Sequence, residues 1–346
     1  MLISSKLPLL IQLRGWSLGH FVLDTEVMLH KVNSLDLQQQ VYFVKPNQIC
    51  NETLLDILSK NVSVLSHRYL LIRRILCRLS KGYAKKVNVI ESFSYDWVTK
   101  AHSKSSVFEP DADFLEQEFT FLRDEYGLTK DSRLVTLAIR DSGYDDPFQE
   151  KSKQPLYRNT PIDYFEHTVE ALISRGFSVF RMGRDSNSRL NISTSGKYWD
   201  LSDIDYPNME RLELAISSIA SFMVSTGTGI EQLSAIFRKP IFLVNFAPPY
   251  ILPSPVYRRV LISQYFVSSS QNDKRLGVKE LLALGLFDSN PAKEISKGKL
   301  RIEPRESNEI LNFVLEIFEF LDRKYLVSGS FNDYIESLEA QGFFVP

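Results

Sequence analysis

The segment from Ser221 to Asn245 constrains the fold of this chain more than any other. It contains an apolar run, a polar turn with two glycines over 225–230, a helical stretch and a second apolar run. Two apolar strands joined through a helix are typical of a parallel sheet. A glycine turn between a strand and a helix offers backbone N–H groups and the positive end of the helix dipole to an anion, usually a phosphate. No lysine follows the turn, which excludes the loop of nucleoside-triphosphate hydrolases and favours a diphosphate that is held without hydrolysis.

The same alternation of strands and helices extends along most of the chain. A first series predicts strands at 9–13, 41–44 and 62–65 and helices at 21–32 and 54–58. A second predicts strands at 134–139, 177–182, 221–224 and 241–244, the last closing the sheet, and helices at 115–126, 161–175, 209–218, 306–325 and 332–340. Gly127 and Gly176 are expected to end helices. Two such series predict an α/β fold of two Rossmann-like domains, over 1–128 and 129–305, followed by C-terminal helices over 306–346.

Polar residues follow several of these strands. Arg140, Arg181, the turn at 225–229 and Asn245 each stand at the carboxyl end of an apolar run. Ligands of open parallel sheets bind at those ends, so these residues are expected to converge on one crevice. An arginine there offers a planar fork of donors that suits a phosphate. The alternative is that Arg140 and Arg181 pair with buried carboxylates, for which Asp141 and Asp185 are the nearest in sequence.

His20 stands at the start of the first predicted helix, with Asp24 and Glu26 shortly after it. A histidine in this position is a candidate base, proton donor or helix cap. The two carboxylates are candidates for the same site. The alternative for them is that they complement the positive end of the helix.

The composition argues against a metal site and against nucleic-acid binding. The histidines show no ligand spacing, and Cys50 and Cys77 form no CxxC pattern, which favours a reducing compartment. An acidic loop after Arg140 (Asp141, Tyr144, Asp145 and Asp146) lacks a carboxylate-x-carboxylate pattern, and we interpret it as a solvated loop that positions Arg140. The formal net charge of -1 is unlike the strong basic excess of nucleic-acid binders.

The membrane signals in the sequence are weak. The start, Met1 to Pro8, lacks the charged and apolar regions of a signal peptide, and no window reaches eighteen uninterrupted apolar residues. A cytoplasmic protein is therefore expected. The segment from Tyr69 to Lys86 predicts an amphipathic helix with an apolar face and a basic face. It is either an ordinary surface helix or an interfacial helix that rests on anionic lipid at the inner face of the cell membrane.

Four segments, taken in order, resemble a family of bacterial glycosyltransferases from cell-surface polysaccharide gene clusters. They are Leu137–Tyr144 with its Arg-Asp-Ser-x-Tyr, Tyr157–Tyr164 with its Tyr-Arg-Asn, Gly176–Gly183 with its Arg-Met-Gly, and Ser225–Gly229 with its Gly-Thr-Gly. Arg14, Gly19 and His20 are also similar to the N-terminal Arg-x-Gly-His signature of that family, here lengthened around Trp16. The resemblance is clearest over 134–248.

The resemblance implies a GT-B fold, in which two Rossmann-like domains face a cleft, and a metal-independent transfer of sugar from a nucleotide-activated donor without a cofactor. Its acceptor is a surface glycan, with a lipid-linked form as one option. His20 would serve the acceptor side and Arg140 the leaving diphosphate. The donor residues it implies are Arg140, Arg158, Asn159, Arg181, Gly183, Ser225, Thr226, Gly227, Thr228 and Gly229. A sugar-nucleotide epimerase and a non-catalytic module that binds a sugar nucleotide or glycan stay open as alternatives.

Overall fold

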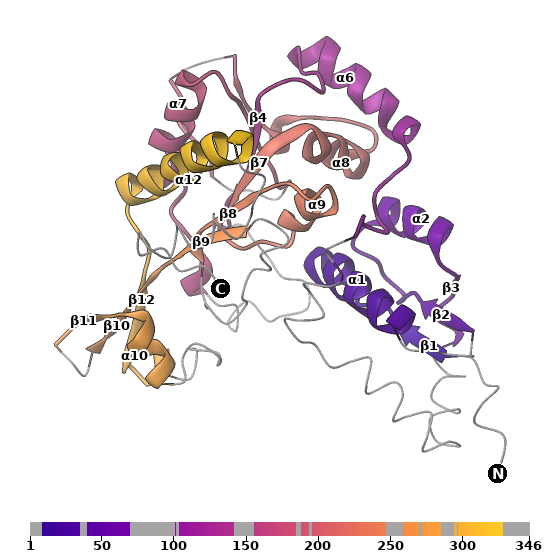
Figure 1. Cartoon of the computed structure of the whole chain (residues 1–346), viewed down its shortest axis with the longest axis horizontal. Coiled ribbons are helices and arrows are strands. Elements are labelled where there is room, and N and C mark those ends of the chain that lie inside the picture. The colour runs from indigo at the N-terminus through magenta and orange to yellow at the C-terminus, as the bar shows by residue number, and fades with distance from the viewer. Residues whose placement is uncertain are drawn as a thin grey trace. The chain divides into compact units, whose positions relative to one another are not determined.

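The computed structural model describes residues 9–34, 40–69, 101, 104–141, 156–184, 188–193, 196–246, 259–269, 272–284, 294–295 and 297–327. The chain divides into two compact units (Figure 1). The first comprises 1–128, 206–218 and 232–238, and the second comprises 129–205, 219–231 and 239–346. Beyond Tyr69, the helix predicted up to Lys86 lies outside the described residues, as do the helix over 332–340, the residues Tyr144 to Asp146, and Asp185. The division into two domains over 1–128 and 129–305 with C-terminal helices over 306–346, and the facing of the two domains across a cleft, stay predictions.

The first unit contains a parallel sheet of three strands in the order β1-β2-β3. The elements are β1 (Leu9–Gln12), α1 (Leu18–Ser34), β2 (Val41–Val44), α2 (Glu52–Asn61) and β3 (Val64–Leu65). The predicted alternation is confirmed here, and α1 begins three residues earlier than expected. Asn51 starts α2 because its side chain accepts a hydrogen bond from the Leu54 N–H.

Further helical segments complete the first unit. A short 3-10 turn, η2 (Ala112–Leu115), leads into α6 (Glu116–Tyr126), which ends at Gly127 in the left-handed conformation with φ of 65°, as predicted. The helix α8 (Met209–Ile219) supplies Arg211, whose Nε lies 2.8 Å from Oε1 of the buried Glu118 on α6. This ion pair fastens two helices that are distant in sequence.

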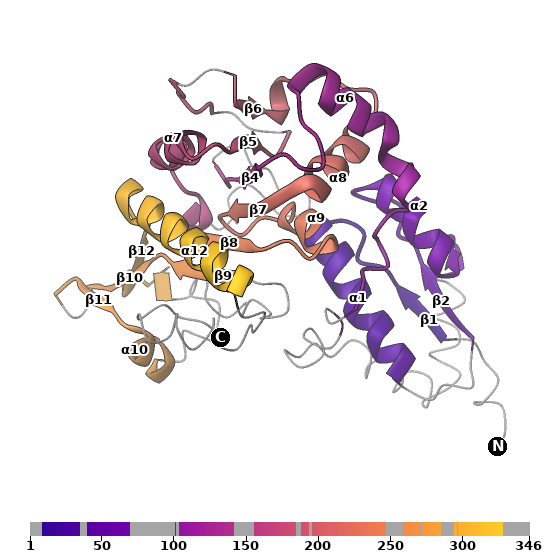
Figure 2. The same cartoon turned by 45° about the horizontal axis from the view of Figure 1, so that its top comes forward.

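The second unit is built on a parallel sheet of six strands (Figure 2). They are β4 (Leu134–Ala138), β5 (Ser178–Arg181), β6 (Tyr198–Asp200), β7 (Ala220–Ser225), β8 (Ile241–Phe246) and β9 (Arg259–Ser263). The prediction that 241–244 closes the sheet is wrong, because β9 pairs with β8 in parallel and becomes the edge strand. Its five residues include Arg259 and Ser263, so the segment carries little of the continuous apolar pattern that marks a buried strand.

The strand order of this sheet, β6-β5-β4-β7-β8-β9, is that of the dinucleotide-binding Rossmann fold. The chain moves outward from β4 to β5 and β6 and then returns to the other side of β4 to form β7, β8 and β9. The direction of winding therefore reverses between β4 and β7. This reversal is the topological switch point, where ligands of such sheets bind.

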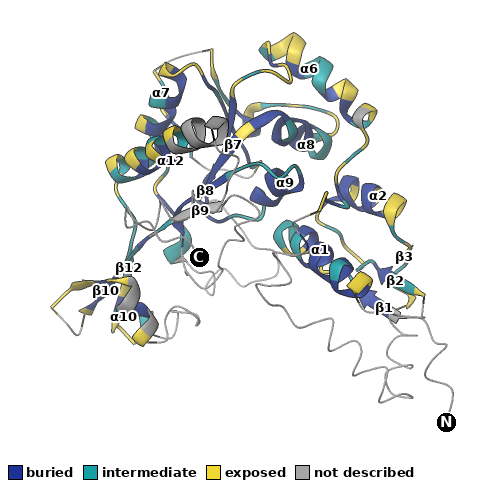
Figure 3. Cartoon of the chain, viewed as in Figure 1, coloured by how far each residue is buried: buried dark blue, intermediate teal, exposed yellow. Residues whose placement is uncertain are grey.

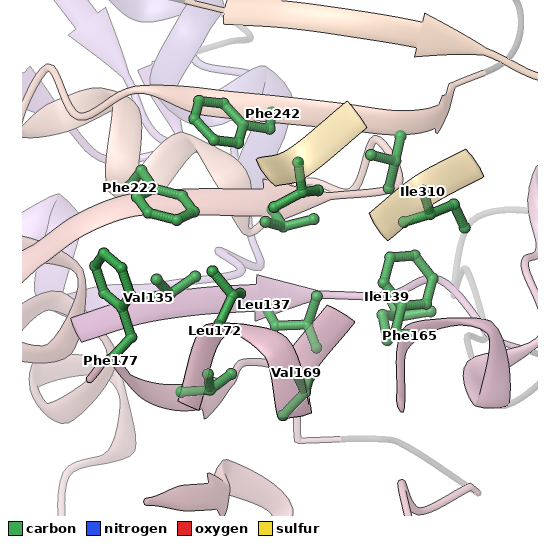
Figure 4. Packing of buried hydrophobic residues seen from close by; sticks show 14 of the residues in the cluster. Val135, Leu137, Ile139, Phe165, Val169, Leu172, Phe177, Phe222, Phe242 and Ile310 are labelled. Atoms are coloured by element: carbon green, nitrogen blue, oxygen red, sulfur yellow. The ribbon is translucent and has the colours of Figure 1, made fainter. Parts of the chain in front are cut away.

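The core of the second unit lies between this sheet and two helices, α7 (Glu166–Ser174) and α12 (Ser307–Val327). Figure 4 shows Val135 and Leu137 of β4 meeting Val169 and Leu172 of α7. The strands β7 and β8 are buried along almost their whole length (Figure 3), as expected for a parallel sheet. The helix predicted over 161–175 begins as a 3-10 turn, η5 (Ile162–Phe165), before α7 continues it.

A second, smaller sheet follows β9 and was not predicted from the sequence. Its antiparallel strands lie in the order β11-β10-β12: β10 (Tyr265–Ser268), β11 (Lys274–Leu276) and β12 (Leu300–Glu303). Together with α10 (Val278–Ala283) it encloses a small core of Phe266, Leu276, Leu281 and Leu300. Tyr157 packs against this core, so the residues just before Arg158 are anchored to the small sheet.

Candidate functional site

The loops after β4 and β7 are joined to each other at the switch point. The Thr226 N–H donates to the carbonyl of Ala138 at 3.0 Å, and the Thr226 hydroxyl accepts from the Arg140 N–H at 2.8 Å. Thr226 and Arg140 are both buried. The two hydrogen bonds therefore fix the loops after β4 and β7 to each other where each loop begins.

The glycine turn is held by its own first residue. The buried Ser225 hydroxyl accepts from the N–H groups of Gly227 at 3.1 Å and Thr228 at 3.5 Å, and donates to Oε2 of Glu231 at 2.9 Å. Two amides that the sequence suggested for a phosphate are thus engaged within the turn. The helix that follows, α9 (Glu231–Ile236), has six residues, so its dipole adds little. The N–H groups of Gly227 and Thr228 are therefore not free to bind an anion at this turn.

Gly227 lies close to an aromatic ring and to an arginine. Its φ is +83°, and a Cβ atom there would meet two ring carbons of Phe246 at 2.6 Å. Nη2 of Arg158 donates to the Gly227 carbonyl at 2.6 Å. The requirement for glycine therefore comes from the backbone angle and from Phe246, and differs from the close ligand approach expected from the sequence.

The segment from Arg158 to Thr160 braces Arg140. Nε of Arg140 donates to Oδ1 of Asn159 at 3.2 Å, and the Thr160 N–H donates to the Arg140 carbonyl at 3.0 Å. Arg158 reaches the glycine turn, as described above. One short segment thus links the loops after β4 and β7 and brings two guanidinium groups to the switch point.

Several buried polar atoms near these loops lack a partner. Among the described residues, Nε of Arg158 and the hydroxyls of Thr160 and Thr228 are buried and form no hydrogen bond. Leaving such a group unsatisfied costs about 1–3 kcal/mol, so native structures contain few of them. Three in one short segment and the adjoining turn indicate a polar ligand at this place.

Arg181 is fully committed to protein partners. It is 1% exposed, and its Nη1 donates to Oδ2 of Asp200 at 2.9 Å and to the Ser188 carbonyl at 2.5 Å. Its Nη2 lies 3.4 Å from Oδ2 of Asp141. Arg181 therefore pairs with carboxylates, which is the alternative to phosphate binding. One of its partners is Asp141, as that alternative expects, and the other, Asp200, was not predicted. Gly183, after β5, has φ of +107°, and a Cβ atom there would meet no atom of the described residues within 4 Å.

A second polar group lies in the first unit, around His20. Oδ2 of Asp24 lies 3.2 Å from Nδ1 of His20 and 3.1 Å from Nη1 of Arg14. Asp24 is buried, whereas the His20 side chain is 55% exposed. A carboxylate on Nδ1 orients the ring and leaves Nε2 as the nitrogen that can accept a proton, which is the arrangement of a histidine base.

The alternative interpretation of Asp24 and Glu26, as residues that complement the helix end, is wrong. The first turn of α1 contains no acidic residue, because the helix begins at Leu18. Asp24 binds His20, and Glu26 is buried beside Arg238, with Oε2 3.3 Å from Nη1.

The described residues contain no group of three His, Cys, Asp or Glu side chains that could hold a metal ion. Within the same residues, no helix combines the length and the apolar character needed to cross a bilayer.

No protein-family model matches this chain, and no curated protein matches its sequence. Among solved structures it is similar to the ADP-heptose lps heptosyltransferase II of E. coli, with 10% identity and a TM-score of 0.47 over 74% of this chain and 90% of that one. It is also similar to a glycosyl transferase family 9 protein from Veillonella parvula, with 10% identity, a TM-score of 0.47, and coverage of 89% and 97%. The iron-containing glycosyltransferase TibC of enterotoxigenic E. coli gives 15% identity, a TM-score of 0.40, and coverage of 74% and 62%. Likeness of this order does not establish a shared activity.

Proposed function

We propose that this chain is a glycosyltransferase of the GT-B type that takes a sugar from a nucleotide-activated donor. The observation that carries the proposal is the group of arginine and threonine side chains at the switch point of a sheet with the dinucleotide-binding strand order. Crevices of this kind bind nucleotides at the carboxyl ends of the strands. The motifs that resemble the glycosyltransferase family supply these same residues.

Arg158 and Arg140 are the residues that we assign to the donor diphosphate. Nη2 of Arg158 is anchored on the Gly227 carbonyl, while its buried Nε has no partner in the described part of the chain. A phosphate oxygen on Nε would gain a charge-assisted hydrogen bond. Arg140, whose Nε is held by Asn159, supplies a second positive charge. Two fixed guanidinium groups would offset the charge that develops on the leaving diphosphate.

The remaining donor residues divide into contact and positioning roles. We assign the unpartnered Thr228 hydroxyl, and Gly229 beside it, to contact with the phosphates. Ser225 and Thr226 shape the turn through the hydrogen bonds described above. Arg181 is a positioning residue, because its guanidinium is occupied by two carboxylates and a carbonyl. Gly183 lies two residues after Arg181, on the loop after β5.

On the acceptor side, we assign His20 as the general base. Asp24 holds Nδ1, so that Nε2 can take the proton of an acceptor hydroxyl as that oxygen attacks the anomeric carbon. His20→Gln is expected to lower transfer by about 10²- to 10⁴-fold, the scale of general-base catalysis, while nucleotide affinity is kept. Asp24→Asn should lower transfer in the same direction because the ring loses its orientation. Unchanged turnover in folded His20→Gln would remove this assignment.

We further propose that the reaction needs neither a metal ion nor a cofactor, because the two arginines provide the positive charge that a metal would otherwise supply. The proposed acceptor is a surface glycan, in a lipid-linked or soluble form. The proposed location is the cytoplasm, with the segment 69–86 as a contact to the inner face of the membrane.

The test combines binding with catalysis. The melting temperature of the protein is measured with each common nucleoside diphosphate. A ligand at 100 times its dissociation constant adds about 2.7 kcal/mol of stability and therefore raises that temperature. Nucleotide sugars are then supplied with and without glycan acceptors. Arg158→Ala should abolish the stabilisation, whereas Arg189→Ala, which removes an exposed arginine paired with Asp203, should not. Binding without transfer or donor hydrolysis would indicate a binding module, and conversion of the free sugar nucleotide would indicate an epimerase.

A further inference from the structure

Gln264 carries a buried side-chain amide that forms no hydrogen bond within the described part of the chain. It lies directly after β9, between the two sheets of the second unit, and is 2% exposed. In the part of the chain that the structure describes, neither its Oε1 nor its Nε2 meets a hydrogen-bond partner. A buried polar side chain in this condition destabilises the free protein and is rare in native structures. A ligand that hydrogen-bonds to this amide would account for its presence in the core.

A neighbouring amide shows that the fold can satisfy such a group at this edge of the sheet. Asn245, fully buried near the end of β8, donates through Nδ2 to the Arg305 carbonyl at 3.3 Å. Its Oδ1 accepts from the Arg305 N–H at 2.6 Å. Both atoms of Asn245 therefore have protein partners. Asn245 thus stabilises the fold through its side chain. The side-chain amide of Gln264, one strand away, makes no such contribution among the described residues.

Gln264 is connected to the glycine turn through a single residue. Its N–H donates to the Phe246 carbonyl at 3.4 Å, and the Phe246 ring lies against Gly227. Neighbouring strands are about 4.8 Å apart, so the end of β9 is about 10 Å from the end of β7. A nucleoside whose phosphates are bound at the switch point extends over such a distance.

We infer that Gln264 recognises the nucleobase of the bound nucleotide. The inference rests on the proposed function, because it takes the phosphates to lie at the switch point. A primary amide presents one acceptor and a donor in one plane. The edge of a nucleobase presents a donor and an acceptor in fixed positions, so that two hydrogen bonds form together, as in amide contacts to adenine. The opposite side of the switch point, around Arg181, already has its charges paired.

The experiment measures nucleotide affinity and stability together. The dissociation constants of ADP, UDP, GDP and CDP are determined by calorimetry for the wild type and for Gln264→Met, which has a similar length and no amide. The variant should bind the preferred nucleotide at least about 10-fold more weakly, and its preference among the four bases should flatten, because two hydrogen bonds are lost. Binding of inorganic pyrophosphate should stay within about twofold of wild type.

Stability should change in the opposite direction. Without nucleotide, Gln264→Met should melt about 2 °C or more above the wild type, because an unsatisfied buried amide is replaced by an apolar side chain. Thr136→Val is the matched control, since the Thr136 hydroxyl is also buried without a partner in the described chain but lies within β4. It should leave all four affinities unchanged.

Three results would overturn the inference. The first is an unchanged base preference in Gln264→Met. The second is an equal loss of affinity for the four nucleotides and for pyrophosphate, which would make Gln264 a support of the loop. The third needs no variant: a wild type that binds all four nucleotides equally does not read the base. A wild type that binds no nucleoside diphosphate overturns the proposed function itself, and is distinguishable from the other three.

Discussion

Replacing Gly227 by alanine tests how the glycine turn is built. The added Cβ would lie 2.6 Å from two carbons of the buried Phe246 ring, well inside contact distance. The residue would also have to keep a φ of +83°, which side chains of L-residues rarely adopt. Gly227→Ala therefore imposes backbone strain and overpacking at the same position.

The two effects can be given magnitudes. A non-glycine residue held at positive φ costs about 1–3 kcal/mol, and overpacking of a core site costs about 1–3 kcal/mol. Gly227→Ala should therefore lower the free energy of unfolding by about 2–6 kcal/mol. Gly176→Ala is the matched control, because Gly176 has a φ of +87° but its Cβ would meet nothing closer than 3.9 Å. Gly176→Ala should therefore lower the free energy of unfolding by the cost of the backbone strain alone.

Urea unfolding of the wild type, Gly227→Ala and Gly176→Ala separates the cost of overpacking from the cost of backbone strain. The double variant Gly227→Ala/Phe246→Leu is measured with them. The smaller leucine should restore part of the stability lost in Gly227→Ala, because it relieves the contact and leaves the strain. A Gly227→Ala protein that is no less stable than Gly176→Ala would refute the tight contact between Gly227 and Phe246. Because the substitution disturbs the fold, weaker nucleotide binding by this variant would not identify a ligand contact.

Three further predictions concern the activity. Arg140→Ala should lower turnover at least about 100-fold, the scale for one preorganised donor, yet stay folded, because the bond to Thr226 uses the Arg140 backbone N–H; near-wild-type transfer by the folded variant would contradict its role. Transfer should persist in excess chelator. A complete loss that magnesium or manganese restores would contradict metal independence and would make Asp141, Asp145 and Asp146 the candidate metal ligands. The protein should sediment with anionic vesicles at low salt and be released as salt rises, since each basic residue near the surface contributes about 1 kcal/mol. Equal binding to neutral vesicles would contradict a basic membrane contact, which should be abolished by glutamine at Arg74, Arg78, Lys81 and Lys85.

Long elements with a strong period were predictable from the sequence. The helix over 306–325 and the strands at 134–139 and 221–224 are present as α12, β4 and β7, within a few residues of the expected ends. Their apolar residues recur often enough to define a buried face. The strand β9 and the small sheet around β10 were missed, because their strands have three to five residues and include exposed charges such as Lys274 and Arg275.

The site was predictable in its location but less so in its bonding. The convergence of Arg140 and the glycine turn followed from strand ends alone. The partners of Arg181 did not, because Asp200 approaches it only through the pairing of β5 with β6. The contact of Phe246 with Gly227 likewise depends on neighbouring strands and has no local sequence signal. The same holds for Gln264, whose side-chain amide has no partner among the described residues.

A crystal structure of the protein with the nucleoside diphosphate that stabilises it most tests the central claim directly. The account predicts the diphosphate at the carboxyl ends of β4 and β7, with its oxygens within 3.2 Å of Nε of Arg158 and of the Thr228 hydroxyl, the range of ordinary hydrogen bonds. A diphosphate bound elsewhere, with both of these atoms still unpartnered, would contradict it.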